Sequence, residues 1–451
     1  MFVLRGVISL WSCILFSSCS VAREPAPPQK VDITQLWGAY SPFFASGTYV
    51  APPAGCHIDQ VNLLQRHGAR FPTSGAATTI ISGVKKLQSV QNYTDPRLDF
   101  LKTFTYSLGV ADLVPFGAHQ SSQAGELAFQ RYSDLISASN LPFVRASSSA
   151  RVVDSATNWT SGFSAASHHI YNPSLSVILP ENGNDTLDDN MCPNAGDSDE
   201  QTNAWLAVFA PNITARLNRW APGANMTDAE TYSLISMCPF HTVASFVPDT
   251  TLKLSPFCAL FTAAEFAAFE YSMDLDKYYG TGYGAFLGRV QGVGYINELL
   301  ARLTHSPVND STQTNTTLTS NPATFPLNRT LYADFSHDNQ MAAIYAAMGL
   351  FPQVAALDPT HPGPRTWVAS HLVPFSARIV VERLRCAKAE GTTQFVRVLV
   401  NDAVQPLDFC AGGEREGMGR GICDLGAFVE SQQYARSGGR RRLGAVFCLK
   451  S

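Results

Sequence analysis

The chain has 451 residues, of which 45% are hydrophobic and 15% are charged. This composition supplies enough apolar side chains for a large folded core and excludes an intrinsically disordered protein. The formal net charge of −4 at pH 7 disfavours a nucleic-acid partner, which needs a basic face, so cations that bind an anionic ligand must be gathered in one place.

The first 22 residues are typical of a secretory signal peptide. Arg5 precedes an apolar stretch from Val7 to Phe16, and the small residues Ser20 and Ala22 stand before a plausible cleavage point. The apolar stretch is too short to span a bilayer, and later hydrophobic windows are interrupted by Gly, Pro or charged residues. We therefore expect a secreted, extracellular protein without a membrane anchor.

Cysteine usage agrees with secretion. Of the 10 cysteines, Cys13 and Cys19 fall in the expected signal peptide, which leaves an even number for disulfides. A zinc site would need closely spaced pairs of the C-x-x-C kind, and the sequence has none. Glycosylation sequons of the form N-x-S/T also fit an extracellular surface and occur at Asn92, Asn158, Asn184, Asn212, Asn225, Asn309, Asn315 and Asn328.

Three segments share a pattern in which a buried strand ends in a polar loop and a helix follows. The strands are expected at 60–65, 141–147 and 330–336, and Ser147 to Ser149 are candidate caps for the second helix. Ligands of open α/β sheets bind outside the carboxyl ends of strands. The charged residues that these loops carry to that edge are Arg66, His67, Arg70, Arg151, His337 and Asp338.

Further strands are expected at 174–179, 377–384 and 395–400, whereas long stretches between them show helical periodicity. We predict an α/β protein with a mixed sheet, helices on both faces and a mainly helical subdomain. The sheet domain is expected at 23–75, 140–197 and 325–451, and the helical subdomain at 76–139 and 198–324. Ser306 to Asn328 reads as an exposed, glycosylated loop.

The segment Arg66 to Thr73 reads RHGARFPT and places an imidazole between two guanidinium groups. Arginine offers bidentate hydrogen bonds to phosphate oxygens, and Gly68 lets the backbone approach without a side chain in the way. A neutral imidazole nitrogen can then attack phosphorus. Taken alone, an R-H-G triplet also fits a structural histidine in a surface loop.

The longer pattern R-H-G-x-R-x-P-T, together with His337-Asp338, resembles the histidine acid phosphatase family. Segments such as LWGAYSPFF, DKYYGTGYG and FPLNRTLYADFSHDN extend the resemblance to fungal phytases over nearly the whole chain, and VAPPAGC, VVDSATNWT and NAWLAVF are most similar to the basidiomycete 6-phytases. The resemblance implies a phosphoglycerate mutase-like (histidine phosphatase) fold. It also implies acidic hydrolysis of myo-inositol hexakisphosphate and lower inositol phosphates, beginning at the 6-position.

By this resemblance, His67 is the nucleophile that forms a phosphohistidine, and Asp338 is the proton donor. The arginines would lower the pKa of His67 by like-charge repulsion, and a bound anion would make Asp338 harder to ionise. Both effects favour catalytic activity at acidic pH. The expected substrate-binding residues are Arg66, Arg70, Thr73, Arg151 and His337 around the scissile phosphate, with Tyr40, Lys277 and Ala39, where many relatives carry Gln, near more distant phosphates.

The resemblance also implies disulfide pairs and partners. The pairs are Cys56 with Cys386, Cys192 with Cys448, Cys238 with Cys258, and Cys410 with Cys423. No cofactor and no metal is expected. The partner is a small-molecule inositol phosphate, with no nucleic acid and no membrane, and we expect a monomer.

Simpler roles and rival functions stay open at this stage. Asp338 could be a helix cap, Lys277 a solvated charge and Tyr40 a packed aromatic ring. A phytase needs cations beyond the cradle, and only Lys277 and Lys85 or Lys86 are candidates. The alternatives are a 3-phytase or broad acid phosphatase of the same family, a phosphoglycerate mutase-like enzyme, and a non-catalytic phosphate-binding or cell-wall protein.

Overall fold

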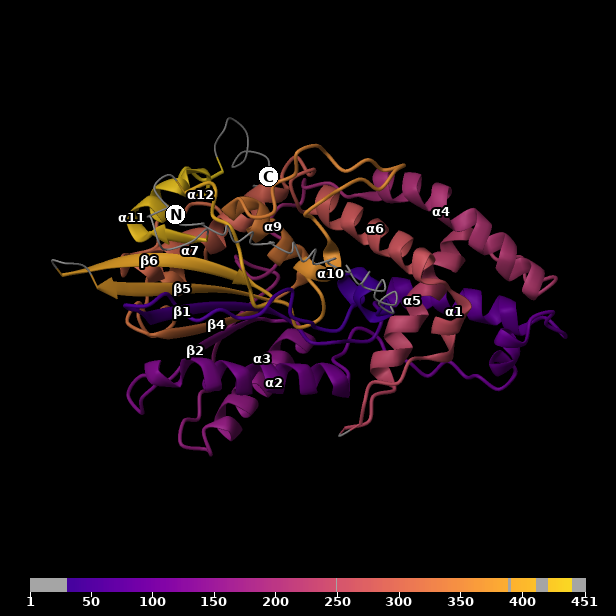
Figure 1. Ribbon diagram of the computed structural model, residues 1–451, viewed down its shortest axis with the longest axis horizontal. Helices are drawn as coiled ribbons and strands as arrows, with labels where there is room; N and C mark the ends of the chain where they lie inside the picture. Colours follow the sequence, from indigo (N-terminus) through magenta and orange to yellow (C-terminus); the bar gives the residue numbers. More distant parts are fainter. Residues whose placement is uncertain (1–30, 249, 388–390, 411–420, 440–451) are drawn as a thin grey trace, which may run out of the picture. The chain divides into compact units, whose positions relative to one another are not determined.

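An eight-stranded sheet is the centre of the fold (Figure 1). The computed structural model describes residues 31–248, 250–387, 391–410 and 421–439, and the described residues from Ile33 onward form one compact unit. The expected signal peptide and Cys448 lie outside the described residues. The strands are β1 (Cys56–Arg66), β2 (Phe143–Ser147), β3 (Leu175–Leu179), β4 (Leu331–Ser336), β5 (Arg378–Ala387), β6 (Thr392–Val400), β7 (Ala403–Val404) and β8 (Ile422–Asp424).

The sheet has a parallel half and an antiparallel half. The strand order is β3-β2-β4-β1-β5-β6-β7, and β8 pairs with β6. The pairs β3/β2, β2/β4 and β4/β1 are parallel, whereas β5 pairs antiparallel with both β1 and β6. Because parallel strands point the same way, the carboxyl ends of β1, β2, β3 and β4 meet at one edge. This arrangement confirms the mixed α/β sheet predicted from the sequence.

Helices cover both faces of the sheet, because side chains on opposite faces of β1 pack against different helices. Val61 and Leu63 pack in a core with residues of α2 and α3, whereas Leu64 packs in the core that includes α7 and α9. The α-helices are α1 (Ser74–Gln88), α2 (Pro115–Tyr132), α3 (Ala150–Ala166), α4 (Asp199–Trp220), α5 (Asp228–Ala244), α6 (Ala263–Gly280), α7 (Val293–Thr304), α8 (Thr316–Thr319), α9 (Asp338–Met348), α10 (Ala369–Leu372), α11 (Leu425–Ser431) and α12 (Gln433–Arg436).

Two glycines explain the close packing of α2 on α3. A Cβ atom at Gly125 would overlap the carbonyl oxygen of Trp159, and one at Gly162 would overlap that of Ser122. Only glycine permits this backbone approach. Because α3 begins directly after β2, the pair of helices fixes where the first turn of α3 meets the carboxyl edge of the sheet.

Helices α1, α4, α5 and α6 form a second group, which Figure 1 shows beside the sheet. Helix α5 packs against α1, α4 and α6. Capping boxes define two of the helix starts: Thr227 with Glu230 for α5, and Thr262 with Glu265 for α6. Helix α2, by contrast, packs mainly on α3 at the sheet.

Three disulfides join distant or neighbouring segments: Cys56 to Cys386, Cys238 to Cys258, and Cys410 to Cys423. These are three of the four pairs that the resemblance implies. The asparagine of every expected sequon is at least partly exposed, so glycan could reach each one. None of the helices in the described ranges is long and apolar enough to cross a membrane.

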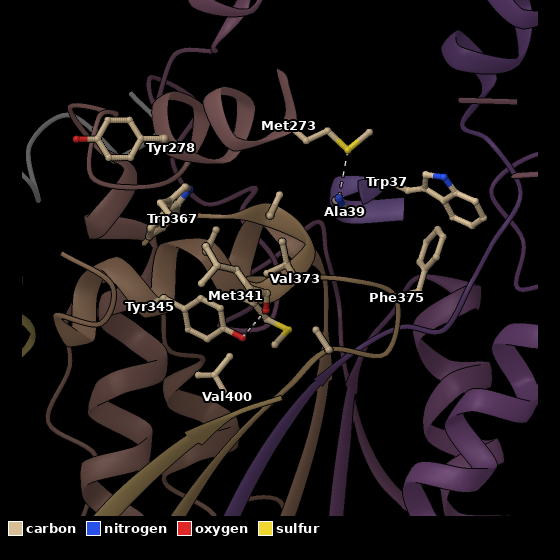
Figure 2. Packing of buried hydrophobic residues seen from close by; sticks show 14 of the residues in the cluster. Trp37, Ala39, Met273, Tyr278, Met341, Tyr345, Trp367, Val373, Phe375 and Val400 are labelled. Atoms are coloured by element: carbon tan, nitrogen blue, oxygen red, sulfur yellow. Dashed lines mark hydrogen bonds between the residues drawn. The ribbon is translucent and has the colours of Figure 1, made fainter. Parts of the chain in front are cut away.

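A buried core positions the short 3₁₀ turn Gly38–Tyr40 (Figure 2). The backbone N–H of Ala39 donates to Sδ of Met273 on α6 at 3.2 Å. The hydroxyl of Tyr345 on α9 donates to the carbonyl of Leu372 on α10 at 3.2 Å. Together these contacts hold the 3₁₀ turn and α10 against helices that begin or end at the carboxyl edge of the sheet.

Candidate active site

Strand register brings the two histidine loops together. Arg66 at the end of β1 pairs with Ser336 at the end of β4, and the N–H of His67 donates to the carbonyl of Ser336 at 3.0 Å. The ring centroids of His67 and His337 are consequently 5.7 Å apart. Gly68 is required because a Cβ atom there would overlap the carbonyl of Gly117 on α2.

A cavity of about 350 Å³ opens at this edge of the sheet. Most of the expected site residues are among those that line it, and His67 lies directly next to the lining residue His337. The lining residues are Ala39, Tyr40, Arg70, Arg151, Glu181, Asp188, Asp189, Asn190, Tyr232, Met273, Asp276, Lys277, His337, Asp338 and Asn339.

Three arginines supply the positive charge. Arg66 is fully buried and donates through Nη1 to the carbonyls of Ala39 and Val373, the latter at 2.6 Å. Nη2 of Arg151 lies 3.2 Å from Nδ1 of His337. Among the buried donors of the described chain, Nε of Arg70 and Nε of Arg151 have no hydrogen-bond partner. Unpaired guanidinium donors at a cavity are suited to binding an anion.

His67 has the tautomer that a nucleophile needs. Its Nδ1 lies 2.8 Å from the carbonyl oxygen of Gly68. A carbonyl can only accept, so Nδ1 carries the hydrogen and Nε2 keeps a lone pair in the neutral ring. Burial first, and then the charges of Arg66 and Arg70, hold the pKa of His67 well below its usual value. The imidazole therefore stays neutral in mildly acidic medium.

Asp338 lies beside two cations. It is the first residue of α9, with His337 at the N-cap, and its Oδ2 lies 3.2 Å from Arg66 and 3.1 Å from Lys277. Burial alone would raise the pKa of Asp338, but the charges of Arg66 and Lys277 outweigh it and hold the pKa well below the usual value. The expectation that Asp338 is harder to ionise concerns the site with a bound anion and stays a prediction.

Of the remaining expected residues, Lys277 and Tyr40 line the cavity and Thr73 does not. Lys277 is buried, and burial alone would lower its pKa, but Asp276 and Asp338 raise it, so the solvated-charge interpretation is wrong. Tyr40 lines the cavity and also packs on Phe240, with ring centroids 4.5 Å apart. Thr73 is exposed at the N-cap of α1 and is absent from the cavity lining described above.

Sequence reasoning missed an acidic wall. Glu181 follows β3 by two residues, and Asp188 and Asp189 lie in the same loop. The signal was available, because β3 was predicted and its polar loop follows the same strand-loop pattern as the other three. With Asp276 and Asp338, these residues make five acidic side chains in the lining, against the three cations Arg70, Arg151 and Lys277.

Glu181, Asp188 and His337 each present one ligand atom within 4.8 Å of the others, a spacing that a divalent cation could use. Both ring nitrogens of His337 already have partners: Nε2 lies 3.0 Å from Oε1 of Glu181, and Nδ1 lies near Arg151. These contacts describe a hydrogen-bonded imidazole.

The histidine at the end of β1 thus lies beside converging guanidinium groups at the carboxyl edge of an α/β sheet. Residues 57–401 match the histidine phosphatase superfamily (branch 2), and the chain belongs to this family, as its sequence motifs predicted. It is 42% identical over 431 residues to Phytase A of Aspergillus fumigatus, covering 90% of this chain and 89% of that protein. It is 41% identical over 428 residues to Phytase A of Aspergillus awamori, covering 90% of each.

The fold is also that of a solved relative. The crystal structure of the phytase from D. castellii superposes with a TM-score of 0.75 at 22% sequence identity, covering 92% of this chain and 89% of that one. The mixed sheet with its helices is therefore the architecture of this family.

Proposed function

We propose that the chain is a phytase that hydrolyses phosphate monoesters of myo-inositol hexakisphosphate at acidic pH. The observation that carries the proposal is the His67 ring, whose Nε2 keeps a lone pair within a group of arginines. The two relatives at 42% and 41% identity are both phytases, which supports the substrate. Exposed sequons and disulfides support a secreted protein, and we expect it to act as a monomer.

The first chemical step forms a phosphohistidine. Nε2 of His67 attacks phosphorus, the bond from phosphorus to the ester oxygen breaks, and Asp338 gives its proton to the departing alkoxide. Arg66, Arg70 and Arg151 supply charge for the phosphoryl oxygens, which is the main requirement of phosphoryl transfer. Water then attacks phosphorus and the P–N bond breaks, while Asp338 recovers a proton from the water.

Asp338 must be protonated for this step, although the free site favours its ionised form. A phosphate group in the cradle carries negative charge that competes with Asp338 for Arg66 and Lys277. Substrate binding should therefore favour the neutral carboxyl group at the moment when an acid is needed, and acidic medium supplies the proton.

We propose the 6-position as the first site of attack, because the sequence is most similar to the basidiomycete phytases. A brief digestion of phytate followed by chromatography of the first pentakisphosphate tests this directly. Loss of the 6-phosphate is expected, and a dominant 3-dephosphorylated isomer would overturn the choice in favour of a 3-phytase.

The acidic lining favours a second candidate, a broad-specificity acid phosphatase. Five carboxyl groups beside three cations are a poor match for a ligand with six phosphates unless several carboxyl groups are protonated. Comparing kcat/KM for phytate and for an aryl phosphate near pH 5 separates the two. A phytase should prefer phytate at least tenfold, whereas equal values would identify the broader enzyme.

A further inference from the structure

Glu181 connects three segments at the edge of the cavity. Its Oε1 accepts from the hydroxyl of Ser147 at 2.9 Å and from the N–H of Ser149 at 2.9 Å, and it lies 3.0 Å from Nε2 of His337. Its Oε2 accepts from the hydroxyl of Ser149 at 3.1 Å. The carboxylate thus links the loop after β3 to the start of α3 and to the loop before α9.

The charge state of Glu181 decides the direction of the contact with His337. The hydrogen bond from His337 lowers the pKa of Glu181 to about 2, against the effect of burial, and the bonds from Ser149 and Ser147 act in the same direction. An ionised carboxylate can only accept, so Nε2 of His337 must carry a hydrogen. The lone pair of the neutral ring is then on Nδ1, which faces Nη2 of Arg151 at 3.2 Å. A guanidinium can only donate, so both contacts require the same tautomer.

We propose that Glu181 is a positioning residue that fixes the His337 imidazole with its hydrogen on Nε2 and with Nδ1 turned toward the phosphate site. This inference rests on the proposed function and on the phosphate-binding role that the family resemblance implies for His337. In the free site, Nδ1 holds Arg151 by accepting from it. When a phosphoryl group engages Arg151, Nδ1 is released; it can then take up a proton from the acidic medium and donate it in a hydrogen bond to a phosphoryl oxygen. Without Glu181 the ring could turn or change tautomer, and Arg151 would lose its partner.

A purely structural role is the competing explanation. Three of the hydrogen bonds of Glu181 go to Ser147 and Ser149, so the residue could simply join the loop after β3 to the start of α3. The two explanations differ in what happens at His337. A structural role predicts altered stability with an unchanged imidazole, whereas a positioning role predicts an altered imidazole.

Three variants separate these explanations. Glu181→Ala removes the acceptor, whereas Glu181→Gln keeps an oxygen that can take the place of Oε1 and so should rescue the tautomer. Ser149→Ala removes the bond from the Ser149 hydroxyl to Oε2 but leaves the contact between Glu181 and His337 intact. It is the matched control for loss of a Glu181 contact without loss of the imidazole contact.

The test is ¹⁵N NMR of histidine-labelled protein at about pH 8, above the usual imidazole range, without substrate. The His337 signal is assigned by its absence from His337→Ala. Wild type, Glu181→Gln and Ser149→Ala should show a hydrogen on Nε2 only, and Glu181→Ala should show a mixture or the other tautomer. A hydrogen on Nδ1 in the wild type, or an unchanged signal in Glu181→Ala, would overturn the proposal.

Because this spectrum needs no turnover, it stays informative even if the protein is not a phytase. The wild-type spectrum also tests the proposal if Glu181→Ala does not fold. Kinetics on an aryl phosphate give an independent readout. We expect kcat to fall at least tenfold in Glu181→Ala and to recover most of that loss in Glu181→Gln, with little change in Ser149→Ala. Equal kcat in Glu181→Ala and wild type would contradict the positioning role.

Discussion

Nη2 of Arg66 lies 3.2 Å from Oδ2 of Asp338, so the expected proton donor is paired with a member of the expected phosphate cradle. The pairing holds the carboxyl group in its ionised form before substrate binds. Because Arg66 is fully buried and fixed by the carbonyls of Ala39 and Val373, it cannot move away from Asp338 easily. Under the proposed function, a bound phosphoryl group would compete with Asp338 for the same guanidinium, so substrate binding would favour protonation of Asp338.

The first prediction concerns Asp338→Asn and leaving-group dependence. The alkoxide of an inositol phosphate is strongly basic, so its departure without a proton donor should slow by about 10²–10⁴-fold. An aryl phosphate has a good leaving group and should lose much less. Steady-state kcat on both substrates measures the difference.

Folding of this variant is easily controlled. Asp338 occupies the first turn of α9, where His337 is the N-cap, so the helix itself tolerates Asn at this position. Loss of the charge leaves the buried cations Arg66 and Lys277 without this partner, so thermal unfolding at pH 7 should occur at a lower temperature than in the wild type, and kinetics are compared below that temperature. A folded variant with equal losses on both substrates, or with no loss on either, would remove Asp338 from the role of proton donor.

The second prediction is that His67→Ala abolishes turnover. A water molecule that replaced the imidazole would be a weaker nucleophile and would not be held in line with phosphorus. Rapid acid quench of the wild type with labelled substrate, followed by peptide mapping, should place phosphate on His67. His241 is half-buried and away from the cavity lining, so His241→Ala is a suitable control that keeps the label. Label on a different residue would show that the proposed intermediate is wrong.

The third prediction tests Lys277 as a determinant of specificity. Its Nζ contacts Asp338 at 3.1 Å and Asn339 at 2.6 Å within the cavity. Loss of one charge-assisted hydrogen bond costs about 1.5–3 kcal/mol, so Lys277→Gln should raise KM for phytate by about tenfold or more. KM for a small aryl phosphate should change less, because that substrate has no distant phosphates.

Lys86→Gln is the matched control for Lys277→Gln. Lys86 lies on α1 and pairs with Glu230 at 2.7 Å, apart from the cavity lining. Its removal should leave both KM values unchanged. If Lys277→Gln changed KM for the two substrates by the same factor, Lys277 would serve the scissile phosphate rather than a more distant one.

Much of the scaffold could be predicted because local pattern and topology agree. Strands β1, β2 and β4 are apolar runs that stop at charged residues, and their parallel pairing brings the three loops together. The Glu181 loop follows the same rule after β3, so it could have been included on the same argument.

Other features depend on contacts that no local pattern encodes. The carbonyls that hold Arg66 come from Ala39 and Val373, which are 27 and 307 residues away in sequence. Lys277 reads as a solvated charge in an acidic helical stretch, yet the packing of α6 buries it beside Asp338. The low pKa of Asp338 follows from these two cations and could not be inferred from the residues next to it.

The fourth prediction uses two carboxyl groups whose pKa values move in opposite directions. Burial, helped by Asp189 and Glu181, raises the pKa of Asp188 from 3.8 to about 6. Asp310 lies in the loop before α8; burial acts to raise its pKa, but hydrogen bonds from Asn297 and Thr312 lower it overall. Replacing each by Asn should therefore change stability with opposite dependence on pH.

For Asp188, the folded protein holds the proton more tightly than the unfolded chain, so wild-type stability falls as pH rises from about 4 to about 6. Asn resembles the protonated form, and the shift corresponds to about 3 kcal/mol at most. Asp188→Asn should thus gain thermal stability relative to wild type as pH rises through this window.

For Asp310, the ionised form is the stabilising one above the unfolded pKa, so Asp310→Asn should lose stability at pH 7 and lose less as the medium becomes acidic. Unfolding temperatures from pH 7 down to about pH 2 measure both effects, because the Asp188 window lies between about pH 4 and 6 and the Asp310 window lies below about pH 4. Parallel slopes for the two variants would contradict the raised pKa of Asp188.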